Sequence, residues 1–224
     1  MLFERQRLLL ALTDSLGGSV AHTDFQKLLF LYTKEWEAEA SYEFVPYQFG
    51  GFSFTSYADK RRLIERELLT ADENRWVLTD AGRRAIRPEK TLTARTSRFA
   101  AAHAGLRGDA LIAETYRRHP YYATRSRVAE RVLTCQSDRA SVQAAKPKPR
   151  GAGLVTIGYE GRSLEAYLNL LLRDTVTILC DVRRNPLSRK YGFSKSTLKA
   201  ACESVNIRYE HLPELGIASS ERKE

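Results

Sequence analysis

A chain of 224 residues, of which 43% are hydrophobic, is long enough for one large or two small globular domains. It has no run of about 18 apolar residues and no secretory signal at its start, so we expect neither a membrane span nor export. Three cysteines without a CxxC pair exclude a disulfide scaffold and favour the reducing cytoplasm as the location.

The net charge of +9 predicts a polyanionic partner, which we expect to be nucleic acid, DNA in preference to RNA. The charge is unevenly spread. Residues 1–88 carry 12 Lys+Arg against 13 Asp+Glu, residues 89–153 carry 13 against 5, and residues 154–224 carry 11 against 9. The basic excess therefore lies in the middle of the chain.

Residues 1–88 predict a winged-helix-like domain. Leucines spaced between residues 8 and 16 predict a first helix that ends at Gly17 and Gly18, and the apolar repeat over 25–36 predicts a second. A third helix is expected from about Ser53, followed by a polar turn and short strand over 71–78. In this arrangement the third helix enters a major groove and the strand hairpin forms the wing.

Four cations of this domain are candidate DNA contacts. Lys60, Arg61 and Arg62 lie on the expected third helix, on a face that we expect to be open to solvent, and Arg75 lies on the strand. Each phosphate contact would release counterions and make binding depend on salt. Because the domain is net acidic, two alternatives stay open: an ordinary solvated face, or docking of a partner protein or second copy.

Two stretches, residues 27–31 and 42–54, resemble the winged-helix part of antitoxin-like and Panacea-type domains from prokaryotic conflict systems. Those domains often have Gly-Pro where this chain has Gly50-Gly51. The resemblance covers residues 5–86. It implies a prokaryotic source, a setting in phage defence or a mobile element, and a role in binding nucleic acid or a partner protein.

Arginines dominate residues 89–136, which we expect to form a basic helical connector. Aromatic residues lie among them, and this combination suits nucleic acid through phosphate pairing and base stacking. The candidate contacts are Arg117, Arg118 and Arg125. The alternative is a solvated connector that binds nothing. Residues 137–153, which end in alternating Lys and Pro, are expected to be a stiffened linker.

Residues 154–224 predict the first half of a Rossmann-like α/β domain with a parallel sheet. Buried strands are expected over 154–157, 176–180 and 207–211, with helices after Ser163 and Ser194. In this βαβαβ order the strands run parallel. The residues that follow the first two strands then meet at the edge where such sheets bind ligands.

That edge holds the candidate active site. Two carboxylates facing one pocket can divide into a nucleophile or base and an acid, because like charges push their pKa values apart. Glu160 is the candidate nucleophile or base, Asp181 the acid or orienting group, and Tyr159 and His211 lie beside them. The alternatives are a solvated Glu160, an Asp181 paired structurally with a neighbouring arginine, and a structural His211.

Candidate phosphate-binding residues follow the second strand, and they are Arg183, Arg184 and Ser188. The chain lacks the glycine spacing of a dinucleotide site or a P-loop, and its His and Cys residues lack metal-ligand spacing. We therefore expect no cofactor and no metal.

Four stretches are similar to the domain-of-unknown-function family 488: residues 156–161, 181–188, 192–194 and 211–216. The family is Rossmann-like, mostly prokaryotic and without an agreed activity. Its motif residues map here onto Tyr159, Glu160, Asp181, Arg183, Pro186, Ser188, His211, Pro213 and Gly216. Members usually continue with more helices and strands and a late Cys-His-Arg motif, so we expect a fragment or a shortened member.

Two functions stay open, and the sequence does not decide whether the protein is an enzyme. The first is a prokaryotic nucleic-acid-binding protein whose α/β domain processes a nucleotide or nucleic acid at a sugar or phosphate centre. The second is a non-enzymatic DNA-binding transcriptional regulator or ligand sensor.

Overall fold

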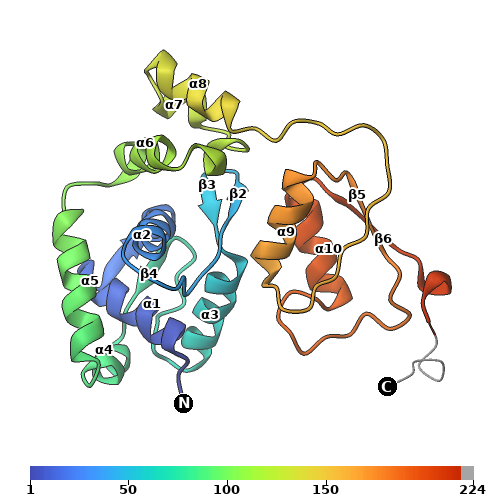
Figure 1. Ribbon diagram of the computed structural model, residues 1–224. Helices are drawn as coiled ribbons and strands as arrows, with labels where there is room; N and C mark the ends of the chain where they lie inside the picture. The colour runs from blue at the N-terminus through green and yellow to red at the C-terminus, as the bar shows by residue number, and fades with distance from the viewer. Residues whose placement is uncertain (218–224) are drawn as a thin grey trace. The chain divides into compact units, whose positions relative to one another are not determined.

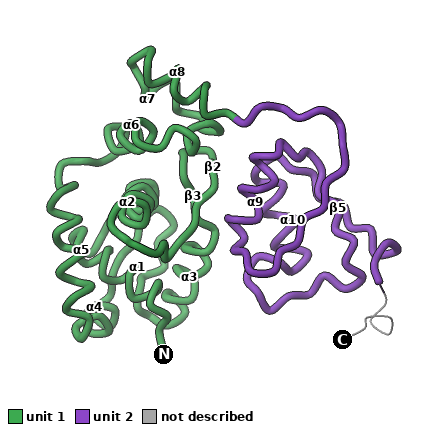
Figure 2. The backbone as a smooth tube through the Cα atoms, in the orientation of Figure 1, with its two compact units in different colours: residues 1–146 green, residues 147–224 purple. Residues whose placement is uncertain are grey.

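The computed structural model describes residues 1–217, in which helices and small sheets mix as expected of an α/β protein (Figure 1). The chain divides into two compact units, residues 1–146 and residues 147–224 (Figure 2). Each unit buries its own set of apolar side chains. Over the described residues, no helix combines the length and the apolar character needed to cross a bilayer.

Unit 1 opens with α1 (Glu4–Ser15), which ends where Gly17 and Gly18 take positive φ angles of 95° and 79°. A side chain at either position would be strained, so this stop could be predicted from the sequence. The elements that follow are β1 (Ser19–Ala21), α2 (His22–Glu35), β2 (Val45–Tyr47), β3 (Gly50–Phe52), α3 (Phe54–Glu65), β4 (Arg75–Val77) and α4 (Asp80–Ile86).

α3 begins where the sequence predicts it, because the Ser53 hydroxyl accepts a hydrogen bond of 3.2 Å from the amide of Ser56. Two antiparallel strand pairs flank the helices. β2 pairs with β3, and β1 pairs with β4 so that Ser19 lies opposite Val77. An antiparallel bridge between Leu69 and Leu78 extends β4 into a hairpin, which we call the 69–78 hairpin.

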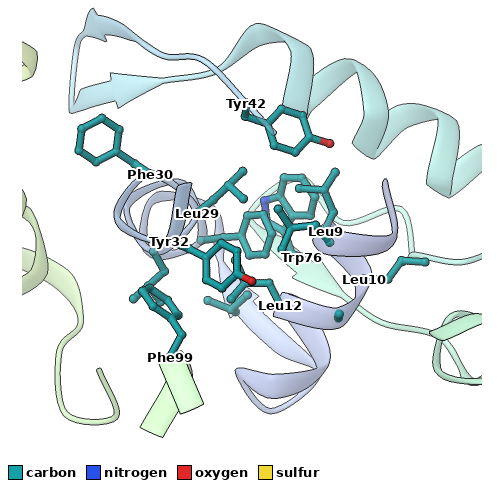
Figure 3. Packing of buried hydrophobic residues seen from close by; sticks show 14 of the residues in the cluster. Leu9, Leu10, Leu12, Leu29, Phe30, Tyr32, Tyr42, Trp76 and Phe99 are labelled. Atoms are coloured by element: carbon teal, nitrogen blue, oxygen red, sulfur yellow. The ribbon is translucent and has the colours of Figure 1, made fainter. Parts of the chain in front are cut away.

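The core of unit 1 gathers around α1 and α2 (Figure 3). The ring of Phe25 stacks on that of Trp76 with centroids 4.0 Å apart, which fixes β4 against α2. The ring of Tyr32 meets that of Phe99 edge-on at 5.2 Å. Phe99 belongs to the expected connector, so part of that stretch contributes to the core.

The remaining helices of unit 1 are α5 (Lys90–Ala102), α6 (Gly108–Arg118), η1 (Pro120–Ala123), α7 (Ala129–Val132) and α8 (Gln136–Ala144). α5 packs along α1, where the hydroxyls of Ser15 and Thr96 lie 2.8 Å apart. Tyr116, Val132 and Val142 bring α6, α7 and α8 together in a second apolar cluster. Residues 89–146 are therefore an integral part of unit 1, and α8 occupies part of the expected linker.

Unit 2 contains α9 (Leu164–Arg173), β5 (Ile178–Asp181), α10 (Lys195–Ser204), β6 (Arg208–His211) and η2 (Pro213–Leu215). β5 and β6 are parallel, with Ile178 opposite Arg208 and Asp181 opposite His211. α9 starts at the expected cap, where the Ser163 hydroxyl accepts from the amide of Ala166 at 3.0 Å.

The prediction of a buried strand over residues 154–157 is wrong in this structure. These residues pair with no strand, and the exposed fractions of Leu154 and Val155 are 92% and 54%. A strand is held by its ladder and its neighbours' side chains, and here β5 pairs only with β6 among the described residues. Two of the three expected strands therefore form.

Candidate functional site

Asp181 is the best-defined polar residue of unit 2. It ends β5 with an exposed fraction of 7%, on the same face of the strand as the buried Leu179. Its Oδ1 accepts from Nε and the amide of Arg183 at 2.8 and 3.1 Å. Its Oδ2 accepts from Nη2 of Arg183 at 2.5 Å and from the hydroxyl of Tyr209 at 2.6 Å. Both oxygens are thus occupied by donors.

These bonds fix the charge of Asp181. Burial alone would raise the pKa of its carboxyl, but the hydrogen bonds from Arg183 and Tyr209 outweigh burial and lower that pKa. The carboxylate in turn raises the pKa of Arg183, and burial together with this bond raises that of Tyr209. Asp181 is therefore an ionised anchor at neutral pH and a poor proton donor.

Arg183 is held on several sides. Its Nη1 donates to the carbonyl of Phe193 at 2.8 Å, and its guanidinium lies 5.2 Å from the ring centroid of Tyr159. The ring of Tyr159 stacks on that of Phe193 at 4.7 Å. Most of the donors that would grip a phosphate are thus already engaged within unit 2.

His211 is a satisfied neutral imidazole in this arrangement. Its Nε2 lies 2.9 Å from the carbonyl of Arg183, and a carbonyl only accepts, so Nε2 carries the proton. Its Nδ1, left as an acceptor, lies 2.9 Å from the ammonium of Lys195. The ring links β6 to the start of α10.

A cleft of about 1010 Å³ opens beside β5, and four of the expected catalytic and phosphate-binding residues line it: Tyr159, Glu160, Asp181 and Arg183. Glu160 is exposed on the 158–161 turn. Arg184, Ser188 and His211 do not line this cleft. The Ser188 hydroxyl instead accepts from the amide of Lys190 at 3.1 Å, which shapes the loop before α10.

Sequence reasoning missed Tyr209 and Phe193, which hold Asp181 and Arg183. The signal for Tyr209 was its strand position, two residues before His211 and therefore on the same face of β6. Of the three cysteines, Cys202 is buried, whereas Cys135 and Cys180 are exposed.

Lys60 does not face solvent, and that prediction is corrected. Its exposed fraction is 4%, because the 69–78 hairpin folds over it. Its Nζ donates to the carbonyls of Asp72 and Arg75, each at 2.8 Å, and contacts Nε2 of His22. Burial lowers the pKa of Lys60 to about 8. The spacing of Tyr57, Lys60 and Ile64, which share one helical face, was the available signal.

The other three candidates of this region are exposed. Arg62 lies 3.7 Å from the buried carboxylate of Asp59. Arg75 donates to the hydroxyl and carbonyl oxygens of Ser19 at 2.8 and 3.1 Å. Among the described residues, Arg61 and Arg75 have no carboxylate within ion-pair distance. Their charges are therefore available to an external anion.

Of the three candidates of the expected connector, two pair with carboxylates and the third is half-buried. Arg117 pairs with Asp138 at 2.9 Å, and Arg118 pairs with Glu35 at 2.8 Å and Glu114 at 2.7 Å. Arg125 is half-buried, and burial lowers its pKa. The charges of Arg117 and Arg118 are thus balanced on the surface.

Residues 163–224 match the family model described as domain of unknown function DUF488. This match confirms that part of the resemblance, and it covers α9, β5, α10 and β6 together with Asp181 and Arg183. Searches of curated proteins and of solved structures gave no match. The resemblance of residues 5–86 to antitoxin-like domains stays a prediction.

Proposed function

We propose that this protein is a prokaryotic regulator that binds duplex DNA through unit 1, used as a winged-helix module. Unit 2, a Rossmann-like domain in this proposal, senses a nucleotide-like ligand in its cleft. Support for the DNA-binding part comes from the order of elements: three helices precede the 69–78 hairpin, which pairs with β1 as a wing does.

The observation that carries the proposal is the pair Arg61 and Arg75. Arg61 lies on α3 next to Lys60, whose ammonium grips the carbonyl of Arg75, so α3 and the hairpin are joined at the residues that bear these charges. Both arginines are exposed and lack a carboxylate partner among the described residues. Helix and wing would then each offer a phosphate contact.

The test is a salt titration of the affinity for a short labelled duplex. Each phosphate contact removed should lower the slope of log K against log[salt] by about 1, so Arg61→Ala and Arg75→Ala should each show that loss. Arg131→Ala is the matched control, because Arg131 is also exposed but is paired with Asp109. Equal slopes in all four proteins would count against the proposal.

The state of Asp181 favours a sensor over an enzyme in unit 2. An acid that is ionised and bonded through both oxygens holds its neighbours in place and has no proton to give. Arg183 and the Tyr159 ring would still give the cleft a cationic and aromatic wall suited to a nucleotide.

The second candidate function is a processing enzyme with Glu160 as nucleophile or base. It is favoured by the exposure of Glu160 on the same cleft as Tyr159 and Arg183. Glu160→Gln decides between the two: loss of turnover on nucleotides or nucleic acid, with DNA affinity intact, would establish the enzyme. Binding of a nucleotide without turnover in the parent protein would establish the sensor.

A further inference from the structure

The turn of the 69–78 hairpin is held by an internal cation. The ammonium of Lys60 rises from α3 and donates to the carbonyls of Asp72 and Arg75, each at 2.8 Å. The carboxylate of Asp72 closes the turn from inside, accepting from the amides of Asn74 and Arg75 at 2.8 and 2.9 Å. The β1–β4 ladder holds the strand of the hairpin, and Lys60 holds its turn against α3.

Lys60 has three N–H donors, and its third contact is Nε2 of His22. An ammonium only donates, so Nε2 must be the unprotonated nitrogen of a neutral ring. The proton then lies on Nδ1, which is 2.9 Å from the hydroxyl of Tyr57. With neutral His22, all three donors of Lys60 are satisfied.

The same Nε2 lies 3.1 Å from the carbonyl of Arg75. If Nε2 gains a proton, it can no longer accept from Lys60 but can donate to this carbonyl. Two donors would then compete for one oxygen, and two like charges would stand in contact. Protonation of His22 therefore removes two acceptors from Lys60. Nε2 of His22 can no longer accept, and the carbonyl of Arg75 is taken by the protonated ring.

The groups around His22 favour the neutral ring at neutral pH. From α3 it faces Tyr57 and Lys60, and from the hairpin it faces Asp72 and Arg75. Burial lowers the pKa of His22 and the charge of Lys60 lowers it further, while the hydrogen bond to the carbonyl of Arg75 and the charge and backbone of Asp72 oppose both. Asp24 lies on the same helix as His22, and its carboxylate accepts a hydrogen bond of 2.8 Å from the amide of Gly108.

We infer that His22 is a positioning residue for the 69–78 hairpin: the neutral ring lets Lys60 hold the turn, and the protonated ring displaces Lys60 and releases it. This rests on the proposed function in one respect, the link to DNA. If the hairpin serves as a wing, acidification weakens duplex binding through His22.

The first measurement needs no DNA. The ring of Trp76 lies 5.3 Å from Nζ of Lys60 and 6.2 Å from the ring of His22, so its emission reports on this cluster. Trp36→Phe leaves Trp76 as the single tryptophan. Its emission should change from about pH 7 to about pH 5, a range that spans the ordinary histidine pKa of about 6.5 and lies below the pKa of about 8 of Lys60. His22→Gln, which keeps an acceptor for Lys60 but does not titrate, should abolish that change.

The second measurement is duplex affinity over the same pH range at constant ionic strength. The parent protein should lose affinity by about tenfold on acidification, the factor that one charged hydrogen bond supports. His22→Gln should show no acid loss, and His119→Gln, which removes a histidine paired with Glu35, should keep the parental profile.

The two measurements distinguish the release of the hairpin from the proposed DNA function. An emission change that depends on His22, without duplex binding at any pH, supports the release of the hairpin and overturns the proposed DNA function. An emission change that survives His22→Gln, or no change in the parent, overturns the inference even if the protein binds DNA well.

Discussion

Lys27 is a cation in the core of unit 1 that pairs with no carboxylate of residues 1–217. Its side chain is fully buried on α2, and its Nζ donates to the carbonyl of Gly51 at 2.9 Å. Burial lowers the pKa of its amine to about 7. The apolar spacing of α2 does not predict the burial of Lys27, because a lysine within such a repeat is expected to extend its ammonium to water.

We predict that the free energy of unfolding rises with pH through Lys27. The unfolded amine titrates near 10.5 and the folded one near 7, so between these values the unfolded chain holds the extra proton and stability grows with pH. The difference between the two pKa values corresponds to about 5 kcal/mol of stability across this pH range. Below about pH 7 both states are protonated and this dependence ends.

Urea denaturation at the two ends of that window, followed by tryptophan emission, measures the effect. Lys27→Met keeps the length of the side chain without its charge, so it should be more stable than the parent at neutral pH and lose this part of the pH dependence. The same pH dependence in both proteins would contradict the prediction.

The Asp181 carboxylate should matter more for stability than for chemistry. Asp181→Asn leaves the partly buried guanidinium of Arg183 without its partner, which should destabilise unit 2 by about 3 kcal/mol. Tyr209→Phe removes one neutral donor and should cost about 1 kcal/mol. Hydrogen exchange of β5 and β6 measures both. Equal effects of the two substitutions would show that the ion pair contributes little.

At the scale of elements, α1, α3 and α9 were predictable, whereas β1, β2 and β3 were not. α1, α3 and α9 carry an apolar repeat together with a glycine stop or a serine cap, and these are local signals. β1, β2 and β3 have three residues each, too few for a periodic pattern. The expected strand over 154–157 has the right composition, but a ladder depends on a partner that composition does not supply.

The candidate site could be predicted only in part for the same reason. Asp181 ends β5 and Arg183 comes two residues later, so their contact follows from the local sequence. The burial of Lys60 depends on the 69–78 hairpin, which reaches it from further along the chain. The pairing of Arg118 with Glu35 joins α6 to α2 and has no local signal at all.

The segment after β6 should tolerate no side chain at Gly216. A Cβ there would lie 2.4 Å from the carbonyl oxygen of Val182 and 2.6 Å from the amide of Arg184, and both are backbone atoms. Gly216→Ala should therefore cost about 1–3 kcal/mol and raise the hydrogen exchange of residues 181–185. Gly158→Ala is the matched control, because nothing lies within 4 Å of the added atom. Equal exchange in both variants would refute the argument.

At the scale of the whole molecule, a net charge of +9 says little about where an anion would bind. Arg117, Arg118 and Arg131 are paired with carboxylates, so their charges contribute little at a distance. Arg61 and Arg75 come from the part of the sequence whose net charge is slightly negative, yet they are exposed without a carboxylate partner among the described residues. Ion pairing, which depends on the fold, therefore decides which cations can attract an external anion.

The two units should unfold in separate steps. Unit 2 is the smaller and buries fewer large apolar side chains, and domains of that size are only marginally stable. Both tryptophans lie in unit 1, so tryptophan emission follows that unit alone while circular dichroism follows both. We expect the dichroism to begin its change at lower urea than the emission. Coincident curves would mean that the units unfold as one.

Within the described residues β5 pairs only with β6, and the side chains of Ile178 and Val182 are 42% and 44% exposed. Amide and carbonyl groups along the other side of that strand are left to water or to a passing chain. Concentrated solutions of this protein should therefore be prone to grow intermolecular sheets from unit 2. Val182→Lys should reduce such growth, because a charged side chain on an edge strand opposes pairing with another chain.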